Sequence, residues 1–205
     1  MLPTLISDSN PHEATSLGAL RNIDLFGYWI TPLFFELHRA ALESHLKLKT
    51  QLPDRLERIA LQGSAQDSIA IHARRGDYFS GDLESAYGLL GPSYYETGSK
   101  LLAENAHMAH PKIFIFTDDA KWANAMLTPK LNFAAQVTIV EQLAMENSAQ
   151  HLNTMSQFQN LVLSNSTFSW WAASLGASKA GVVSPKSWGI KLGDAALLGK
   201  DWILT

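Results

Sequence analysis

Two patterns of apolar positions alternate along the chain after about residue 60. Short apolar runs bounded by turn-forming residues predict buried strands, and longer segments with apolar residues at helical spacing predict amphipathic helices. The predicted strands are 68–73, 113–117, 136–140, 160–164 and 181–184, and the predicted helices are 93–106, 119–127, 149–158 and 167–175. Strand and helix in alternation indicate parallel pairing with right-handed crossovers. The sequence therefore predicts an α/β fold with a Rossmann-like parallel sheet covered on both faces.

The pattern before that point is less regular. Residues 1–20 mix Pro, Ser, Asn and His without a clear period, which predicts an irregular leader. Pro32 suits the first position of a helix, and an apolar stripe extends from it to about Thr50. We expect a helix there, and a loop over 62–67 in front of the first strand of the sheet.

Composition narrows the class of protein. Of 205 residues, 46% are hydrophobic and 17% charged, which suits one good-sized or two small globular domains. A formal charge of -3 argues against a general binder of nucleic acid or of anionic membranes. The lack of cysteine excludes disulfides and thiolate metal sites and suits the cytosol. No run approaches the roughly 20 apolar residues of a membrane span, and residues 1–10 do not resemble a secretory signal, so export is not expected.

The first candidate site lies at the end of the predicted strand 68–73. Because side chains alternate across a strand, His72 and Arg74 share one direction if the extended geometry continues, and Arg75 takes the other. One arginine would then face a ligand, while a carboxylate such as Asp77 holds the second. Guanidinium groups pair their donors with phosphate oxygens, so a diphosphate is the expected guest. The alternative is a polar loop with two solvated arginines.

A second candidate lies where the predicted strand 160–164 ends and the next helix begins. Helix starts present unpaired N–H groups and the positive end of the macrodipole, so a start rich in hydroxyls can seat an anion. Ser and Thr are also ordinary helix caps, and the pattern alone leaves both functions open. The spacing of Trp171 to Phe168 and Leu175 predicts that Trp171 lies in the core. The residues of this cluster are Ser164, Asn165, Ser166, Thr167 and Phe168.

Asp118 and Asp119 form a third candidate, directly after the predicted strand 113–117. An acid at such a strand end can accept hydrogen bonds from ribose hydroxyls or from the two donors on a guanine edge. Asp119 can equally cap the helix that follows. No His or Glu pair at metal-ligand spacing accompanies these acids, so we expect no metal site.

In combination, several segments resemble the bacterial alpha-1,2-fucosyltransferases of glycosyltransferase family 11. They are 26–29, 72–78, 116–119, 164–173 and 185–188. The most specific is the run Asn-Ser-Thr-Phe-Ser-Trp-Trp that begins at Asn165. The resemblance implies a GT-B-type fold, GDP-fucose as the donor substrate, inversion at the sugar carbon, and neither a metal nor a cofactor.

The resemblance also implies roles for residues at matching positions. Arg74 would contact the donor diphosphate, with His72 near the nucleotide and Asp77 supporting the loop; these are the catalytic candidates. Asp118 or Asp119 would read guanine or ribose. The donor-binding candidates are His72, Arg74, Arg75, Asp118, Asp119 and Asn165, together with Ser166, Thr167 and Phe168, which would close around the phosphates.

Two departures from the family pattern bear on activity. Family members start with a glycine-rich loop, Gly-Gly-Leu-Gly-Asn-Gln-Met-Phe, which faces the acceptor and the sugar, and nothing in 1–25 matches it. They also carry an Asp near the position of His151, so an acid expected in that helix is missing. His72 and Asp77 are the candidates for the general base, and the reason is only their proximity to the expected donor site.

These features predict the domains and the function. We expect 1–60 to be a remnant of the acceptor-side region with a connecting helix, and 61–205 to be a Rossmann-like domain that binds a GDP-sugar. The expected function is transfer of L-fucose from GDP-fucose to the 2-hydroxyl of a terminal galactose in a glycan. We expect it in the cytoplasm and without nucleic acid, and peripheral association with the inner face of the membrane stays open. One alternative is a catalytically incomplete nucleotide-binding remnant or partner subunit of the same family, and another is a related transferase with a different donor or linkage.

Overall fold

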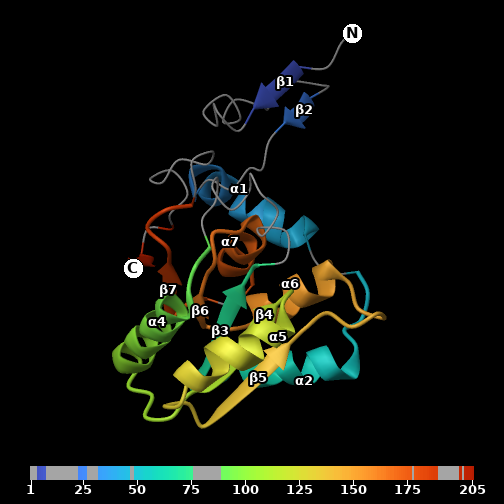
Figure 1. Cartoon of the computed structure of the whole chain (residues 1–205). Helices are drawn as coiled ribbons and strands as arrows, with labels where there is room; N and C mark the ends of the chain where they lie inside the picture. Colours follow the sequence, from blue (N-terminus) through green and yellow to red (C-terminus); the bar gives the residue numbers. More distant parts are fainter. Residues whose placement is uncertain are drawn as a thin grey trace.

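A six-stranded sheet forms the centre of the protein in the computed structural model (Figure 1). The structure describes residues 4–7, 23–26, 32–46, 49–75, 89–176, 178–188, 199 and 201–205. The strands of this sheet are β3 (Ser68–Ala73), β4 (Lys112–Thr117), β5 (Gln136–Val140), β6 (Asn160–Val162), β7 (Gly181–Ser184) and β8 (Ile203–Leu204). They lie in the order β5-β4-β3-β6-β7-β8, and all neighbouring pairs are parallel.

The strand order creates a switch point between β3 and β6. From β3 the chain builds the sheet outward through β4 to β5, and it then returns to the other side of β3 with β6. In open parallel sheets of this kind, ligands bind beyond the carboxyl ends of the strands at such a switch point. The predicted Rossmann-like α/β class is confirmed, and the sheet brings the ends of β3, β4 and β6, where the candidate residues lie, to one edge.

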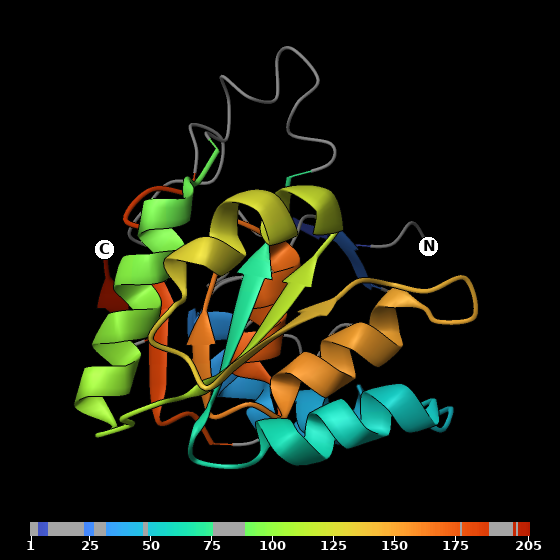
Figure 2. The same cartoon turned by 60° about the horizontal axis from the view of Figure 1, so that its bottom comes forward.

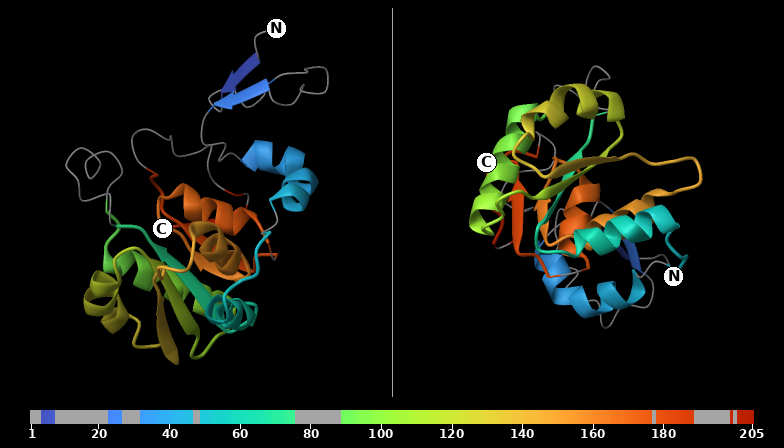
Figure 3. Two further views of the ribbon diagram at one scale, coloured as in Figure 1. Left: turned by 90° about the vertical axis from the view of Figure 1, so that its right-hand side faces the viewer. Right: turned by 90° about the horizontal axis from the view of Figure 1, so that it is seen from below.

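Helices cover both faces of the sheet (Figure 2, Figure 3). One face carries α1 (Pro32–His45), α2 (Asp54–Gly63), α6 (Ser148–Ser156) and α7 (Thr167–Ser174). The other carries α4 (Pro92–Asn105), the short α5 (Ala120–Trp122), a π-helical turn at Ala123–Leu127 and a 3-10 turn at Thr128–Lys130. Alternate residues of β3 supply the two cores, Ala70 to the first and Ile71 to the second, as the period of a strand requires. None of the helices in the described ranges is long and apolar enough to cross a bilayer.

The prediction of an irregular leader is wrong for part of 1–20. β1 (Thr4–Ser7) is a strand that pairs in parallel with β2 (Ile23–Phe26). Such pairing joins segments that are distant in sequence, so the absence of a local period does not exclude it.

The predictions for the first two helices need correction. α1 ends at His45 and not at about Thr50. The sequence reading also missed α2. Its signals are present, since Asp54 and Glu57 stand in the first turn and the apolar face is buried at Leu56 and Ile59.

The prediction that Trp171 lies in the core needs correction, because Trp170 is the fully buried tryptophan of α7. Trp170 is 1% exposed and packs edge-on against Phe35 of α1, with ring centroids 6.0 Å apart. Trp171 is only partly buried, at the margin of the same core. Because this helix is apolar on nearly all sides, periodicity could not decide which tryptophan faces inward.

Candidate functional site

The candidate site lies where β3 and β6 separate. The ladder between them ends with Ile71 opposite Val162. Beyond this pair, His72 continues β3, while the chain after β6 turns into the start of α7. The rings of His72 and Phe168 stack, with centroids 4.9 Å apart and planes inclined by 27°. The sequence cluster at the end of β3 and the cluster at the start of α7 therefore meet.

His72 is enclosed by these neighbours and only 7% exposed. Its Nδ1 lies 2.8 Å from the Oγ of Ser164, and Phe168 covers one face of the ring. Burial, helped by the cation of Arg74, lowers the pKa of His72 from 6.5 to about 3. The imidazole is neutral near pH 7 and too weakly basic to serve well as a general base, which speaks against that role. Asp77, the other candidate base, lies outside the described residues.

The two arginines after His72 have different surroundings. The Arg75 guanidinium lies 3.9 Å from the ring centroid of Trp122, on the face of α4 and α5, whereas His72 faces α7. The predicted alternation is therefore confirmed for this pair. The Nη1 of Arg74 lies 2.9 Å from the Oδ2 of Asp118, and the Arg74 side chain is 38% exposed. A guanidinium carries several N–H donors in a planar fork, so it can hold a carboxylate and phosphate oxygens together.

Asp118 and Asp119 fix the helix after β4 and the segment Arg74–Arg75, which we call the arginine segment. Asp118 accepts a hydrogen bond from the backbone N–H of Arg75 at 2.9 Å, in addition to its pairing with Arg74. Asp119 is the N-cap of α5 and accepts from the N–H of Trp122 at 2.9 Å. The capping alternative is thus confirmed for Asp119. Recognition of guanine or ribose by either acid stays a prediction.

The start of α7 has no side-chain cap from its own N-cap residue. Ser166 occupies the N-cap position in extended backbone, but in the described part of the chain its side chain makes no capping hydrogen bond. The hydroxyl of Ser169 instead donates to the carbonyl oxygens of Ser164 and Ser166, at 2.9 Å each, and so fixes the turn. Asn165 is 3% exposed within it, and Thr167 opens the helix. Among the described residues, Ser166 therefore does not act as the ordinary cap, and binding of an anion at this helix start stays a prediction.

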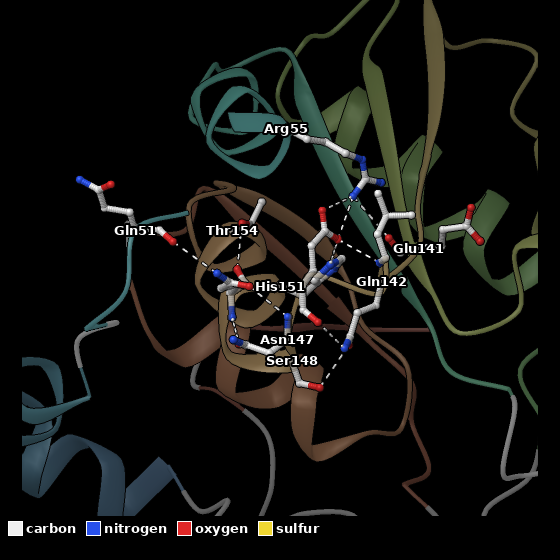
Figure 4. Close-up of polar contacts among 11 residues, drawn as sticks. Gln51, Arg55, Glu141, Gln142, Asn147, Ser148, His151 and Thr154 are labelled. Atoms are coloured by element: carbon white, nitrogen blue, oxygen red, sulfur yellow. Dashed lines mark hydrogen bonds and ion pairs between the residues drawn. The ribbon is translucent and has the colours of Figure 1, made fainter. Parts of the chain in front are cut away.

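A second buried polar cluster lies between α2, α6 and the loop after β5 (Figure 4). The Nε2 of His151 lies 2.7 Å from one carboxylate oxygen of Glu146. The Nη1 of Arg55 donates to both oxygens of this carboxylate, at 3.0 and 3.1 Å. Burial disfavours the charged form, but the N–H of Leu143 and the bonds to His151 and Arg55 outweigh it and lower the pKa of Glu146. The Glu146 carboxylate thus links α2, α6 and the loop after β5, and we call the group Arg55, Glu146 and His151 the brace.

Sequence reasoning missed Arg55 and Glu146. It marked His151 only as the position where an acid is expected, and the structure places the carboxylate of Glu146 beside it from the preceding loop. Arg55 and Glu146 are 91 positions apart, so no local pattern links them. One readable signal existed nearby: the capping box of Asn147 and Gln150, which fixes the start of α6 directly after Glu146.

The chain is similar to glycosyltransferases along most of its length. Residues 11–203 match the profile of Glycosyl transferase family 11. The O-antigen biosynthesis glycosyltransferase WbnK of Escherichia coli is 31% identical over 139 residues, which are 67% of this chain and 44% of the relative. An alpha-1,2-colitosyltransferase of Escherichia coli is 25% identical over 171 residues, which are 82% of this chain and 56% of the relative. The chain spans about half the length of these curated relatives.

Solved structures of POFUT1 are similar over part of the chain. The crystal structure of POFUT1 in complex with GDP has a TM-score of 0.41 at 12% identity, covering 64% of this chain and 46% of that one. A crystal structure of POFUT1 in complex with GDP-fucose has a TM-score of 0.41 at the same 12% identity, covering 64% of this chain and 45% of that one.

Proposed function

Because the chain belongs to glycosyltransferase family 11, we propose that it binds GDP-fucose at the junction of β3 and β6 and transfers the fucose to the 2-hydroxyl of a terminal galactose in a glycan. One observation carries the proposal: the contacts of His72 with Phe168 and Ser164 bring the arginine segment and the start of α7 together at the sheet edge. The GDP diphosphate lies at this junction. Transfer proceeds with inversion at the sugar carbon and without a metal.

The charges at the junction suit a diphosphate leaving group. When the acceptor hydroxyl displaces GDP, its oxygen forms a bond to the sugar carbon and its proton passes to a base, while the bond from the sugar carbon to the diphosphate oxygen breaks and negative charge grows on that oxygen. The Arg74 guanidinium and the N–H groups at the start of α7 would meet this charge with donors already in place. Interactions that strengthen as the charge grows lower the barrier instead of merely tightening binding. Removal of one such donor typically raises the barrier by on the order of 3 kcal/mol.

The neighbouring residues support this arrangement. Asp118 holds Arg74 and the backbone of Arg75, so the guanidinium does not have to be ordered when the donor arrives. In the proposal Ser166 and Thr167 close around the phosphates, next to the Phe168 ring that covers His72.

Transfer of a different sugar is a second candidate function. The relative that matches over 82% of this chain carries the name alpha-1,2-colitosyltransferase. The groups assigned here contact the diphosphate, which belongs to the GDP part of the donor. They therefore give no preference for one sugar over another. Fucose and colitose transfer therefore differ only in the donor that the enzyme prefers.

Calorimetric titration with GDP tests the binding step. The wild-type chain should bind GDP, and Arg74→Ala should weaken binding about ten- to a hundredfold, because a hydrogen bond to a charged group contributes about 1.5–3 kcal/mol. Arg39→Ala is the matched control, since Arg39 is also a partly exposed arginine paired with carboxylates, but on α1. Equal affinity in all three proteins would contradict the phosphate assignment.

A turnover assay tests the transfer step. GDP release is measured with GDP-fucose and a galactoside acceptor, and in parallel with GDP-colitose. Faster release from GDP-fucose supports the leading function, and faster release from GDP-colitose supports the second. GDP binding without release from either donor would show a nucleotide binder that lacks turnover.

A further inference from the structure

Ser164 belongs to the second sequence cluster and contacts His72, but the proposed function assigns no chemical role to its hydroxyl. It follows β6 and is fully buried. Its backbone carbonyl accepts from the hydroxyl of Ser169 and from the N–H of Ser166, which leaves the side chain separate from the turn contacts. Within the described part of the chain, the one hydrogen-bond partner of the Ser164 hydroxyl is the Nδ1 of His72, at 2.8 Å. The Ser164 hydroxyl therefore acts on the His72 imidazole and takes no part in fixing the turn.

Two arrangements of hydrogens could fill this contact. In the first, the Ser164 hydroxyl donates to the lone pair of Nδ1, and the ring hydrogen is on Nε2. In the second, Nδ1–H donates to Oγ, and the hydroxyl hydrogen of Ser164 has no acceptor among the described residues. The Ser164 side chain is fully buried, so no water can take up its hydrogen, whereas His72 is 7% exposed and its Nε2 is not among the fully buried atoms that lack a partner. A buried donor without an acceptor is costly, so the first arrangement is favoured.

We propose that Ser164 is a positioning residue, which holds His72 in the neutral tautomer with its hydrogen on Nε2. His72 then presents an N–H donor, and this donor serves the phosphate oxygens of the nucleotide, a step that rests on the function proposed above. The stack of Phe168 on the ring limits its rotation, so the Nε2–H keeps one direction. Among the described residues, the Nε2 atom has no hydrogen-bond partner.

The tautomer also decides which chemistry His72 performs. With hydrogen on Nε2 and Nδ1 occupied by Ser164, the ring has no lone pair to offer the acceptor hydroxyl. The low basicity of the buried ring agrees with this assignment, which rests on the geometry. His72 is therefore a donor that binds charge and not a proton acceptor.

Nuclear magnetic resonance of the protein without ligand tests the tautomer directly. Long-range correlations between the ring nitrogens and carbon-bound hydrogens of His72 distinguish a protonated Nε2 from a protonated Nδ1. We expect a pyrrole-like Nε2 and a pyridine-like Nδ1 near pH 7. A pyrrole-like Nδ1 or a doubly protonated ring would overturn the proposal, whatever the ligand is.

Variants separate positioning from packing. Ser164→Ala should give a mixture of the two tautomers at His72, because the hydroxyl donor is gone. Ser164→Thr keeps the hydroxyl and should restore the wild-type signature. Ser169→Ala is the matched control, because it removes another buried hydroxyl of the same turn that does not touch His72. An unchanged signature in a folded Ser164→Ala protein, or the same loss in Ser169→Ala, would contradict the role of Ser164.

A titration with GDP connects the tautomer to the ligand. On addition of GDP, the Nε2 signal of His72 should shift, and Ser164→Ala should weaken GDP binding about three- to tenfold, as expected for one hydrogen bond of about 0.5–1.5 kcal/mol. If wild-type protein fails to bind GDP while the tautomer is the expected one, the proposed function fails and the positioning role of Ser164 stands. If the protein binds GDP but His72 carries its hydrogen on Nδ1, the proposed nucleotide binding stands and the positioning role of Ser164 fails.

Discussion

His72 and His151 are both buried on the same side of the sheet, yet they lie in different kinds of surroundings. His72 is 7% exposed and His151 is 5% exposed. In each imidazole, one ring nitrogen lies within hydrogen-bond distance of an oxygen atom. The partner of His72 is a hydroxyl, and the partner of His151 is a carboxylate that Arg55 also binds. The ring of His151 belongs to a network of three side chains that includes an arginine and a carboxylate, whereas the ring of His72 contacts one neutral hydroxyl at the start of α7. Burial alone therefore does not identify a functional histidine.

The two corners also differ in what they connect. The network of Glu146 joins α2, α6 and the loop after β5, so its removal should act on stability. The junction at His72 joins the end of β3 to the start of α7, where the arginine segment lies, so changes there should act on ligand binding.

Glu146→Ala should produce the largest loss of stability in this comparison. The change leaves Arg55, His151 and the N–H of Leu143 without their common partner, and breaking such a buried pair costs on the order of 3 kcal/mol. Urea unfolding measures this loss, with Glu141→Ala as a control in the same loop, where the side chain is exposed. GDP affinity of the folded variant should stay within about twofold of wild type. A stable variant with weak GDP binding would reverse the roles of the two corners.

His72 should make stability depend on pH in the acid range. The unfolded chain takes up a proton at this residue below about pH 6.5, but the folded protein does so only near pH 3. Its contribution is therefore complete above pH 6.5 and is lost as the pH falls, by at most about 1.4 kcal/mol per unit. Unfolding free energies of wild type and His72→Gln, measured from pH 7 to pH 4, should diverge in this direction. His110→Gln, at an exposed histidine, is the control, and parallel curves for wild type and His72→Gln would contradict the prediction.

Asp119→Ala should have the smallest of these effects. The variant loses the cap of α5 and with it about 1 kcal/mol of stability. Asp67→Ala, which breaks only an exposed ion pair with Lys112, should lose less. Thermal unfolding of both variants measures the difference. An Asp119→Ala protein as stable as wild type would remove the structural role assigned to this carboxylate.

The sheet could be predicted from the sequence to a large extent. β3, β5 and β7 have the predicted bounds, because short apolar runs between turn-forming residues have few other ways to be buried. The meeting of the clusters at the ends of β3, β4 and β6 follows from parallel pairing, since that pairing brings the carboxyl ends of all strands to one edge.

The parts that were missed depend on contacts between distant segments. The brace joins Arg55 to Glu146 across 91 positions, and the contact between Ser164 and His72 spans 92. In α7 the choice between Trp170 and Trp171 depends on the segments that pack on the helix, since Trp170 lies against both Phe35 of α1 and Trp202 near the C-terminus, and not on the helix itself. Periodicity reports which segments have an apolar side, but the neighbour that covers it is set by the tertiary fold.

Hydrogen exchange with and without GDP tests the central claim, that the junction of β3 and β6 is the nucleotide site. Phosphate oxygens bound to the N–H groups at the start of α7 should slow exchange in 164–168 and in 72–75. The brace at 141–151 should exchange at the same rate in both states. Protection of 141–151, without protection of 72–75 and 164–168, would contradict the account.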